Sequence, residues 1–166
     1  MGNYCAKYSL RKKTFDSLNY LELTRNKIYD AKVVSVYDGD TCHIVIKHNG
    51  NFYKVCVRIN GIDAPEMRPF NVSNMDIKNE IKQQAKRSRN FLINNITDQK
   101  IELDRDISKH ELQQLVDNNK KIIQFKYIKP EKYGRSLGDL LINDKSISEI
   151  MILNNFAKIY DGGKKN

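Results

Sequence analysis

The sequence contains no tryptophan, few prolines and glycines, and no long hydrophobic run. A membrane-spanning helix needs about 18 or more apolar residues in succession, and no such stretch without a charge is present. The first thirty residues also lack the apolar segment of a secretory signal. We therefore expect neither a transmembrane nor a secreted protein. The 166 residues, 40% of them hydrophobic, are enough for one domain with its own core.

Cysteine and histidine are too few and too scattered to predict a zinc site or a disulfide framework. The three cysteines form no Cys-x-x-Cys pair, and their number is odd. Asn49-Gly50, between two alternating runs, predicts a two-residue hairpin that pairs Cys42 with Val57. Cys42 and Cys56 then point to opposite faces of the sheet, so we expect both thiols to be reduced.

Acidic residues are outnumbered by basic ones. The chain has 29 Lys and Arg against 20 Asp and Glu, which gives a formal net charge of +9. Such an excess on a small surface favours polyanionic partners without saying which kind. Nucleic acid and anionic lipid are both compatible with it.

Hydrophobic patterning predicts an α+β domain with more strands than helices. β-branched and aromatic residues alternate with polar ones in three consecutive segments, which predicts an antiparallel meander over 31–37, 41–47 and 52–59. Apolar residues at helical spacing predict an amphipathic helix over 76–96. Further short strands are expected at 101–104, 122–128 and 137–142, and capping boxes predict helices after Ser108 and Ser146. This order is typical of helices packed on a small closed or partly closed sheet.

Three polar segments interrupt this pattern: Asp38-Gly-Asp40-Thr41, Arg58 to Glu66, and Tyr133-Gly-Arg135. Each by itself is an ordinary turn or loop sequence. Together they supply carboxylates for a hard cation such as Ca²⁺ or Mg²⁺ and arginines for a phosphate. The hairpin register places Arg58 opposite Thr41, so Asp40 reaches Arg58 only if the chain bends near Gly39. A metal, two arginines and a spare carboxylate are the groups that phosphodiester hydrolysis requires.

In order, spacing and type, these residues resemble the staphylococcal (micrococcal) nuclease family. The resemblance extends from about Lys27 to Tyr160. It implies an OB-fold-type five-stranded β-barrel with packed helices. It also implies a Ca²⁺-dependent endonuclease that acts on DNA and RNA with little sequence preference, and it favours Ca²⁺ over Mg²⁺. We expect the protein to be a monomer.

The resemblance assigns a metal role to four positions. Asp40 and Asp63 would bind the ion together with the backbone carbonyl of Ala64. Asp38 would hold a metal-bound water. The family prototype has Thr where this chain has Ala64, a mild departure because the expected ligand is the carbonyl oxygen.

Four further positions receive roles toward the substrate. Glu66 would orient or deprotonate the attacking water, and Arg58 and Arg135 would clamp the scissile phosphate. Tyr133 would contact the neighbouring nucleotide. For Asp38 and Tyr133, a plain turn former and a packing residue are equally compatible with the sequence.

The resemblance also sets the expected domain boundaries. Residues 1–26 form a basic tail with a short helix around 15–23, residues 27–162 the nuclease-like domain, and 163–166 a second basic tail. The stretch from about 106 to 130 is longer than in the prototype. The prototype's last helix has no counterpart before the chain stops at Asn166.

The N-terminus resembles a lipid-attachment signal. Gly2 follows the initiator methionine as myristoylation requires, Cys5 is placed for palmitoylation, and Arg11-Lys-Lys13 adds a basic cluster. Ala6 departs from the pattern, which asks for Ser or Thr there, and a solvated tail is the alternative. We expect a cytoplasmic protein, held on the inner face of a membrane if the acylation occurs.

Two other functions compete with cleavage. Nuclease-like OB barrels also serve as catalytically weak modules that bind nucleic acid or a protein partner, usually after losing the charged residues that this chain keeps. A sequence-independent binder of single strands is the second alternative, with Phe52, Tyr53 and Tyr133 as stacking surfaces. Dependence on Ca²⁺ would separate cleavage from binding.

Overall fold

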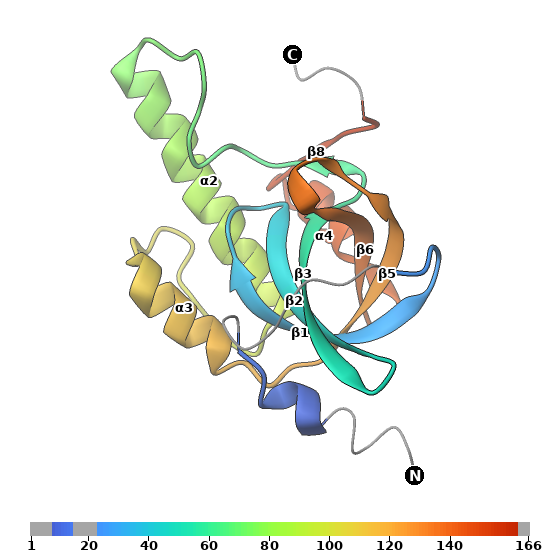
Figure 1. Cartoon of the computed structure of the whole chain (residues 1–166). Coiled ribbons are helices and arrows are strands. Elements are labelled where there is room, and N and C mark those ends of the chain that lie inside the picture. Colours follow the sequence, from blue (N-terminus) through green and yellow to red (C-terminus); the bar gives the residue numbers. More distant parts are fainter. Residues whose placement is uncertain (1–7, 15–22, 163–166) are drawn as a thin grey trace.

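The computed structural model describes residues 8–14 and 23–162 (Figure 1). The two candidate lipidation positions, Gly2 and Cys5, lie outside the described residues, as do most of the expected helix at 15–23 and the C-terminal tail at 163–166. In the part of the chain that the structure does describe, no helix combines the length and the hydrophobicity needed to cross a membrane.

Five strands close into a barrel. They are β1 (Ile28–Val36), β2 (Thr41–His48), β3 (Asn51–Ile59), β5 (Ile123–Pro130) and β6 (Ser136–Ile142). Neighbouring strands follow the order β3-β2-β1-β5-β6, and a parallel pairing of β3 with β6 completes the ring. The predicted α+β class and the five-stranded OB-type barrel are confirmed (Figure 1).

The β2–β3 hairpin has the register that its turn predicts. Asn49 and Gly50 both have positive φ, 47° and 83°, as a tight two-residue hairpin turn requires. Cys42 pairs with Val57, and Cys56 pairs with His43 on the other face. Both strand cysteines are free thiols, as predicted.

Three of the helices in the described part of the chain contribute to the barrel's core: α2 (Met75–Ile96), α3 (Lys109–Asp117) and α4 (Ile147–Leu153). At the start of α3, the Ser108 side chain accepts a hydrogen bond from the Glu111 backbone N–H at 3.2 Å, which confirms Ser108 as the N-cap, whereas the Glu111 carboxylate pairs with Arg105. Ser146 stands at the predicted start of α4, but its side chain makes no capping hydrogen bond.

The segments between these elements are short or irregular. Two-residue strands β4 (Ile62–Asp63) and β8 (Lys158–Ile159) pair with each other, and β7 (Lys145–Ser146) pairs antiparallel with the end of β6. The prediction of a strand at 101–104 is wrong, because this segment forms a turn. The Asn94 side chain on α2 satisfies both backbone groups of Ile101, at 2.7 Å each, and takes the place of a partner strand.

One hydrophobic core joins the barrel and the helices. Each strand of the barrel contributes fully buried residues, for example Ala31, Ile44, Val57, Phe125 and Leu140. Side chains of α2, α3 and α4 belong to the same cluster. The helices are therefore fixed relative to the strand ends where the polar segments lie.

The stretch from about 106 to 130, expected to be longer than in the family prototype, contains α3 and β5. β5 is a strand of the barrel, whereas α3 and its flanking loops lie outside the barrel. In Figure 1, α3 lies beside the lower half of α2 and next to β1. This placement creates a wall close to the β1–β2 loop.

Candidate active site

The loop between β1 and β2 is closed by its own backbone and side chains. The Tyr37 N–H donates to the Thr41 carbonyl at 2.9 Å, and the Asp40 N–H donates to the Asp38 carboxylate at 3.1 Å. Asx turns of this kind stabilise sharp bends. The chain thus bends at 38–40, where the sequence required it for Asp40 and Arg58 to meet.

Gly39 allows this loop to approach α2. A Cβ at this position would overlap the Ser88 hydroxyl and lie 2.7 Å from the Ala64 Cβ. No other residue fits without displacing the helix or the 62–64 segment. The glycine is required here by close packing.

Asp40 and Arg58 form a buried ion pair at the mouth of the hairpin. Asp40 and Arg58 are 5% and 7% exposed, and one Arg58 guanidinium nitrogen lies 3.0 Å from Asp40 Oδ2. The other nitrogen lies 3.2 Å from Asp63 Oδ1. The Ala64 N–H donates to Asp40 Oδ2 at 2.8 Å, and the Thr41 hydroxyl donates to Oδ1 at 2.9 Å. Two carboxylates distant in sequence therefore converge on one cationic group.

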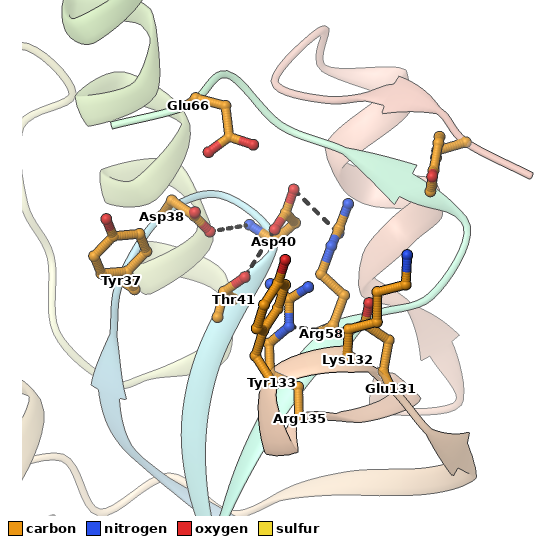
Figure 2. A pocket seen from close by; sticks show the side chains of 11 residues that line it. Tyr37, Asp38, Asp40, Thr41, Arg58, Glu66, Glu131, Lys132, Tyr133 and Arg135 are labelled. Carbon is orange, nitrogen blue, oxygen red and sulfur yellow. Dashed lines mark hydrogen bonds and ion pairs between the residues drawn. The ribbon is translucent and has the colours of Figure 1, made fainter. Parts of the chain in front are cut away.

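Acidic charge is crowded beside this pair. Burial raises the pKa of Asp38 to about 7, and the negative charges of Asp40 and Glu66 add to the effect. Glu66 lies above Asp38 and Asp40 with its carboxylate turned toward them (Figure 2). A positive ion among these groups would relieve their mutual repulsion.

The second arginine is held by a loop between β5 and β6. Arg135 Nε donates to the Glu131 carboxylate at 2.6 Å, and the Glu131 N–H donates to the Arg135 carbonyl at 2.8 Å. Between them, Tyr133 is 91% exposed and has φ 62° and ψ 31°, a left-handed conformation that is uncommon for a bulky residue. This local strain, held by the Glu131–Arg135 contacts, presents the Tyr133 ring to solvent.

A cavity of about 570 Å³ brings most of the predicted residues together. Six of them line it: Asp38, Asp40, Arg58, Glu66, Tyr133 and Arg135 (Figure 2). Asp63 and Ala64 do not line it but contact Arg58 and Asp40, which do. Five other residues in the lining were not predicted: Tyr37, Thr41, Glu131, Lys132 and Tyr160. Tyr37 and Thr41 adjoin the Asp-Gly-Asp motif, whereas Glu131 and Tyr160 carry no signal in the sequence.

The donor set suits a hard divalent cation. Carboxylate and carbonyl oxygens are the ligands that Ca²⁺ and Mg²⁺ prefer. Asp40 and Asp63 both pair with the positive charge of Arg58. The negative charge that is crowded around Asp38 could be balanced by a metal ion. Among the described residues, no group of three or more His, Cys, Asp or Glu side chains could hold an ion by themselves. An ion would therefore need the two carboxylates together with backbone and water oxygens.

Comparison with known proteins gives one family. The family described as staphylococcal nuclease homologue matches residues 56–166, which is most of the chain. No curated protein matches. The matched region begins within β3, so it contains Arg58, Asp63, Glu66 and Arg135, whereas the Asp-Gly-Asp loop precedes it.

Proposed function

The chain belongs to the staphylococcal nuclease family, and from this premise we propose that it is a divalent-metal-dependent endonuclease. Its substrates would be DNA and RNA, cleaved with little sequence preference. One observation carries the proposal: a single cavity is lined by two arginines from different elements and by four carboxylates, those of Asp38, Asp40, Glu66 and Glu131.

We assign the two arginines to the phosphate. Arginine binds phosphate oxygens through two parallel hydrogen bonds, and a developing negative charge strengthens those bonds. Arg58 is positioned by Asp40 and Asp63, and Arg135 by Glu131. Both side chains are thus oriented before substrate arrives, which lowers the cost of ordering them during the reaction.

We assign proton transfer to Glu66. Its carboxylate is exposed at the rim of the same cavity, within reach of solvent water. A carboxylate in this position can orient or deprotonate a water molecule that attacks the phosphorus. Tyr133, the most exposed tyrosine of the lining, would contact the adjoining nucleotide.

Asp40, Asp63 and the carbonyl of Ala64 would hold the cation, with Asp38 ordering a water beside it. When bound, the cation neutralises negative charge on the phosphodiester. The family likeness favours Ca²⁺ over Mg²⁺.

The decisive experiment incubates purified protein with plasmid DNA, single-stranded DNA and RNA in millimolar Ca²⁺, in Mg²⁺, or with a chelator. We expect all three substrates to be cut in Ca²⁺ and none with the chelator. Intact substrates under every condition would contradict the proposal and leave a binding module. Activity in Mg²⁺ equal to that in Ca²⁺ would contradict only the choice of ion.

We also propose that the N-terminal segment attaches the protein to the inner face of a membrane. Leu10 is buried against Val34 and Val45, which supports a fixed docking of the segment on the barrel, and Arg11 and Lys12 next to it are exposed. A single acyl chain binds a membrane weakly, so a second chain or a basic cluster is needed. In eukaryotic cells, Gly2→Ala should move the protein from the membrane fraction to the soluble one. Mass spectrometry that finds Gly2 and Cys5 unmodified would contradict this proposal.

A further inference from the structure

A second cavity, of about 430 Å³, lies next to the first. Its walls come from the end of β1, from β2, from Arg89 of α2 and from one face of α3. Tyr37 lines both cavities, and Arg68 of the second lies two residues after Glu66 of the first. A polymer bound at the first cavity can therefore continue into the second without leaving the surface.

The α3 wall is rigidly placed. Lys109, Leu112, Gln113 and Val116 recur at helical spacing and share the face that lines the cavity. The Gln113 side-chain amide donates to the carbonyl of Val34 at 2.6 Å, which ties the middle of α3 to β1. The cavity is thus formed by the folded protein before any ligand binds.

The two cavities differ in charge. Four carboxylates line the first, whereas the described residues that line the second include no Asp or Glu. The second has three cationic side chains instead: Arg68, Arg89 and Lys109. None of the three forms an ion pair within 4 Å in the described part of the chain. Such a site selects for an anion.

Arg89 is the most firmly held of these cations. It is 5% exposed, and its Nε and one terminal nitrogen donate to the Asn90 side-chain oxygen at 3.2 and 3.0 Å. The Asn90 amide nitrogen in turn donates to three backbone carbonyls of the loop after α2: Glu102, Leu103 and Arg105. This network orients a buried guanidinium whose hydrogen-bond partner is a neutral oxygen, and the negative charge of Asp106 acts on it only from beyond ion-pair distance.

Apolar surface accompanies the positive charge. Val36, Leu112 and Val116 are nearly or fully buried around the cavity, and the Tyr37 ring, 49% exposed, stands at the border between the two cavities. A nucleobase stacks on exposed aromatic rings and packs on apolar side chains. The phosphate groups of the same nucleotide would bind the three cationic side chains.

We propose that this second cavity binds one unpaired nucleotide of the substrate strand, adjacent to the scissile phosphate. The proposal rests on the proposed nuclease function and adds to it a site, walled by α3, for the nucleotide next to the scissile phosphate. The volume falls within the range of small-molecule sites, about 300–1,000 Å³, and admits one nucleotide but not a base pair in a helix. A duplex must expose a base before it can use the cavity.

The test measures affinity with a chelator present, so that no cleavage interferes. The probe is a fluorescein-labelled oligothymidylate of about eight nucleotides, within the span of one OB fold, and its anisotropy reports binding. The variant Arg68→Glu/Lys109→Glu reverses two exposed charges of the cavity. The matched control, Lys120→Glu/Lys145→Glu, makes the same change in net charge at exposed positions outside it.

We expect the cavity variant to lose about tenfold more affinity for the oligonucleotide than the control, and Tyr37→Ala to lose about fivefold. A hairpin duplex should show no such difference between the two double variants. Equal losses in both double variants, or no loss in either, would overturn the proposal. If wild-type protein cuts nothing in Ca²⁺ yet shows the selective loss, the nuclease function fails and the nucleotide site stands.

Discussion

Two parts of this protein bury charge, and they do so in opposite ways. The Lys32 ammonium, in a side chain 1% exposed, donates to the backbone carbonyls of Arg11, Lys13 and Asp117 at 3.0, 2.6 and 2.8 Å. Burial lowers the pKa of Lys32, but each of its three N–H groups has an acceptor. In the active-site group, by contrast, burial and then the negative charges of neighbouring carboxylates raise the pKa of Asp38 to about 7.

The difference separates a structural charge from a functional one. Lys32 is saturated by the protein itself, so it stabilises the docking of the N-terminal segment and offers nothing to a ligand. The acidic group retains unbalanced charge that a metal ion and a phosphodiester can use. Variants at the two places should therefore change different properties, stability at Lys32 and turnover at the acidic group.

The largest effect is expected on turnover. Glu66→Gln and Arg135→Ala should each lower kcat about 10²- to 10³-fold, because each removes a group that acts mainly in the transition state. Affinity for an oligonucleotide should change far less. Kinetics on single-stranded DNA in Ca²⁺ and anisotropy with a chelator measure the two quantities.

Glu149→Gln and Arg25→Ala serve as matched controls, since both residues are exposed and neither lines the cavity. They should keep wild-type kcat. If Glu66→Gln and Arg135→Ala keep it as well, the assignment of roles in the cavity is wrong.

The next effect is on stability. Lys32→Met keeps the length of the side chain but removes the donor to three carbonyls, and each buried acceptor left without a partner costs about 1–3 kcal/mol. We expect the free energy of unfolding to fall by roughly 2–4 kcal/mol in urea titrations, part of the loss being offset by water. Specific activity at a temperature where the variant is folded should be unchanged. A large loss of activity with no loss of stability would reverse the distinction between the two regions.

Metal binding should stabilise the fold by a comparable or smaller amount. A ligand at about 100 times its dissociation constant adds about 2.7 kcal/mol to the free energy of unfolding. Ca²⁺ should therefore raise the Tm of the wild type, and Asp63→Asn should abolish the shift. Asp144→Asn, at an exposed position, should preserve it. A Tm that does not respond to Ca²⁺ would contradict the proposed metal site.

The smallest effect concerns His43, beside the second cavity. Burial, and then the positive charge of Lys54, lowers the pKa of His43 to about 4, against about 6.5 for an unperturbed imidazole. As the pH falls through this window, the unfolded chain takes up a proton that the folded protein does not, so stability is lost. His43→Gln should flatten the dependence between about pH 6.5 and 4 relative to wild type. If the free energy of unfolding changes with pH in the same way in both proteins, His43 contributes nothing to the pH dependence of stability.

Short-range features of the fold could be predicted from the sequence. The Asn49-Gly50 turn determines which residues of β2 and β3 are opposite, so the pairing of Thr41 with Arg58 followed directly. The Ser108 cap and the long α2 depend on interactions between residues three or four positions apart. The prediction of a strand at 101–104 was wrong because a side chain of α2, and not a neighbouring strand, forms the backbone hydrogen bonds there.

By itself, the sequence of this protein determined its hairpin register, its capped helices, and a set of acidic and basic residues characteristic of one nuclease family. Only the tertiary structure decided how those charges are partnered. Arg58 shares Asp40 and Asp63 because the barrel closes around them, Glu131 aligns Arg135 across a strained loop, and α3 completes a basic cavity beside an acidic one. The reason is physical: turns and caps are decided by neighbouring residues, whereas the environment of a charge depends on every chain segment that packing brings to it.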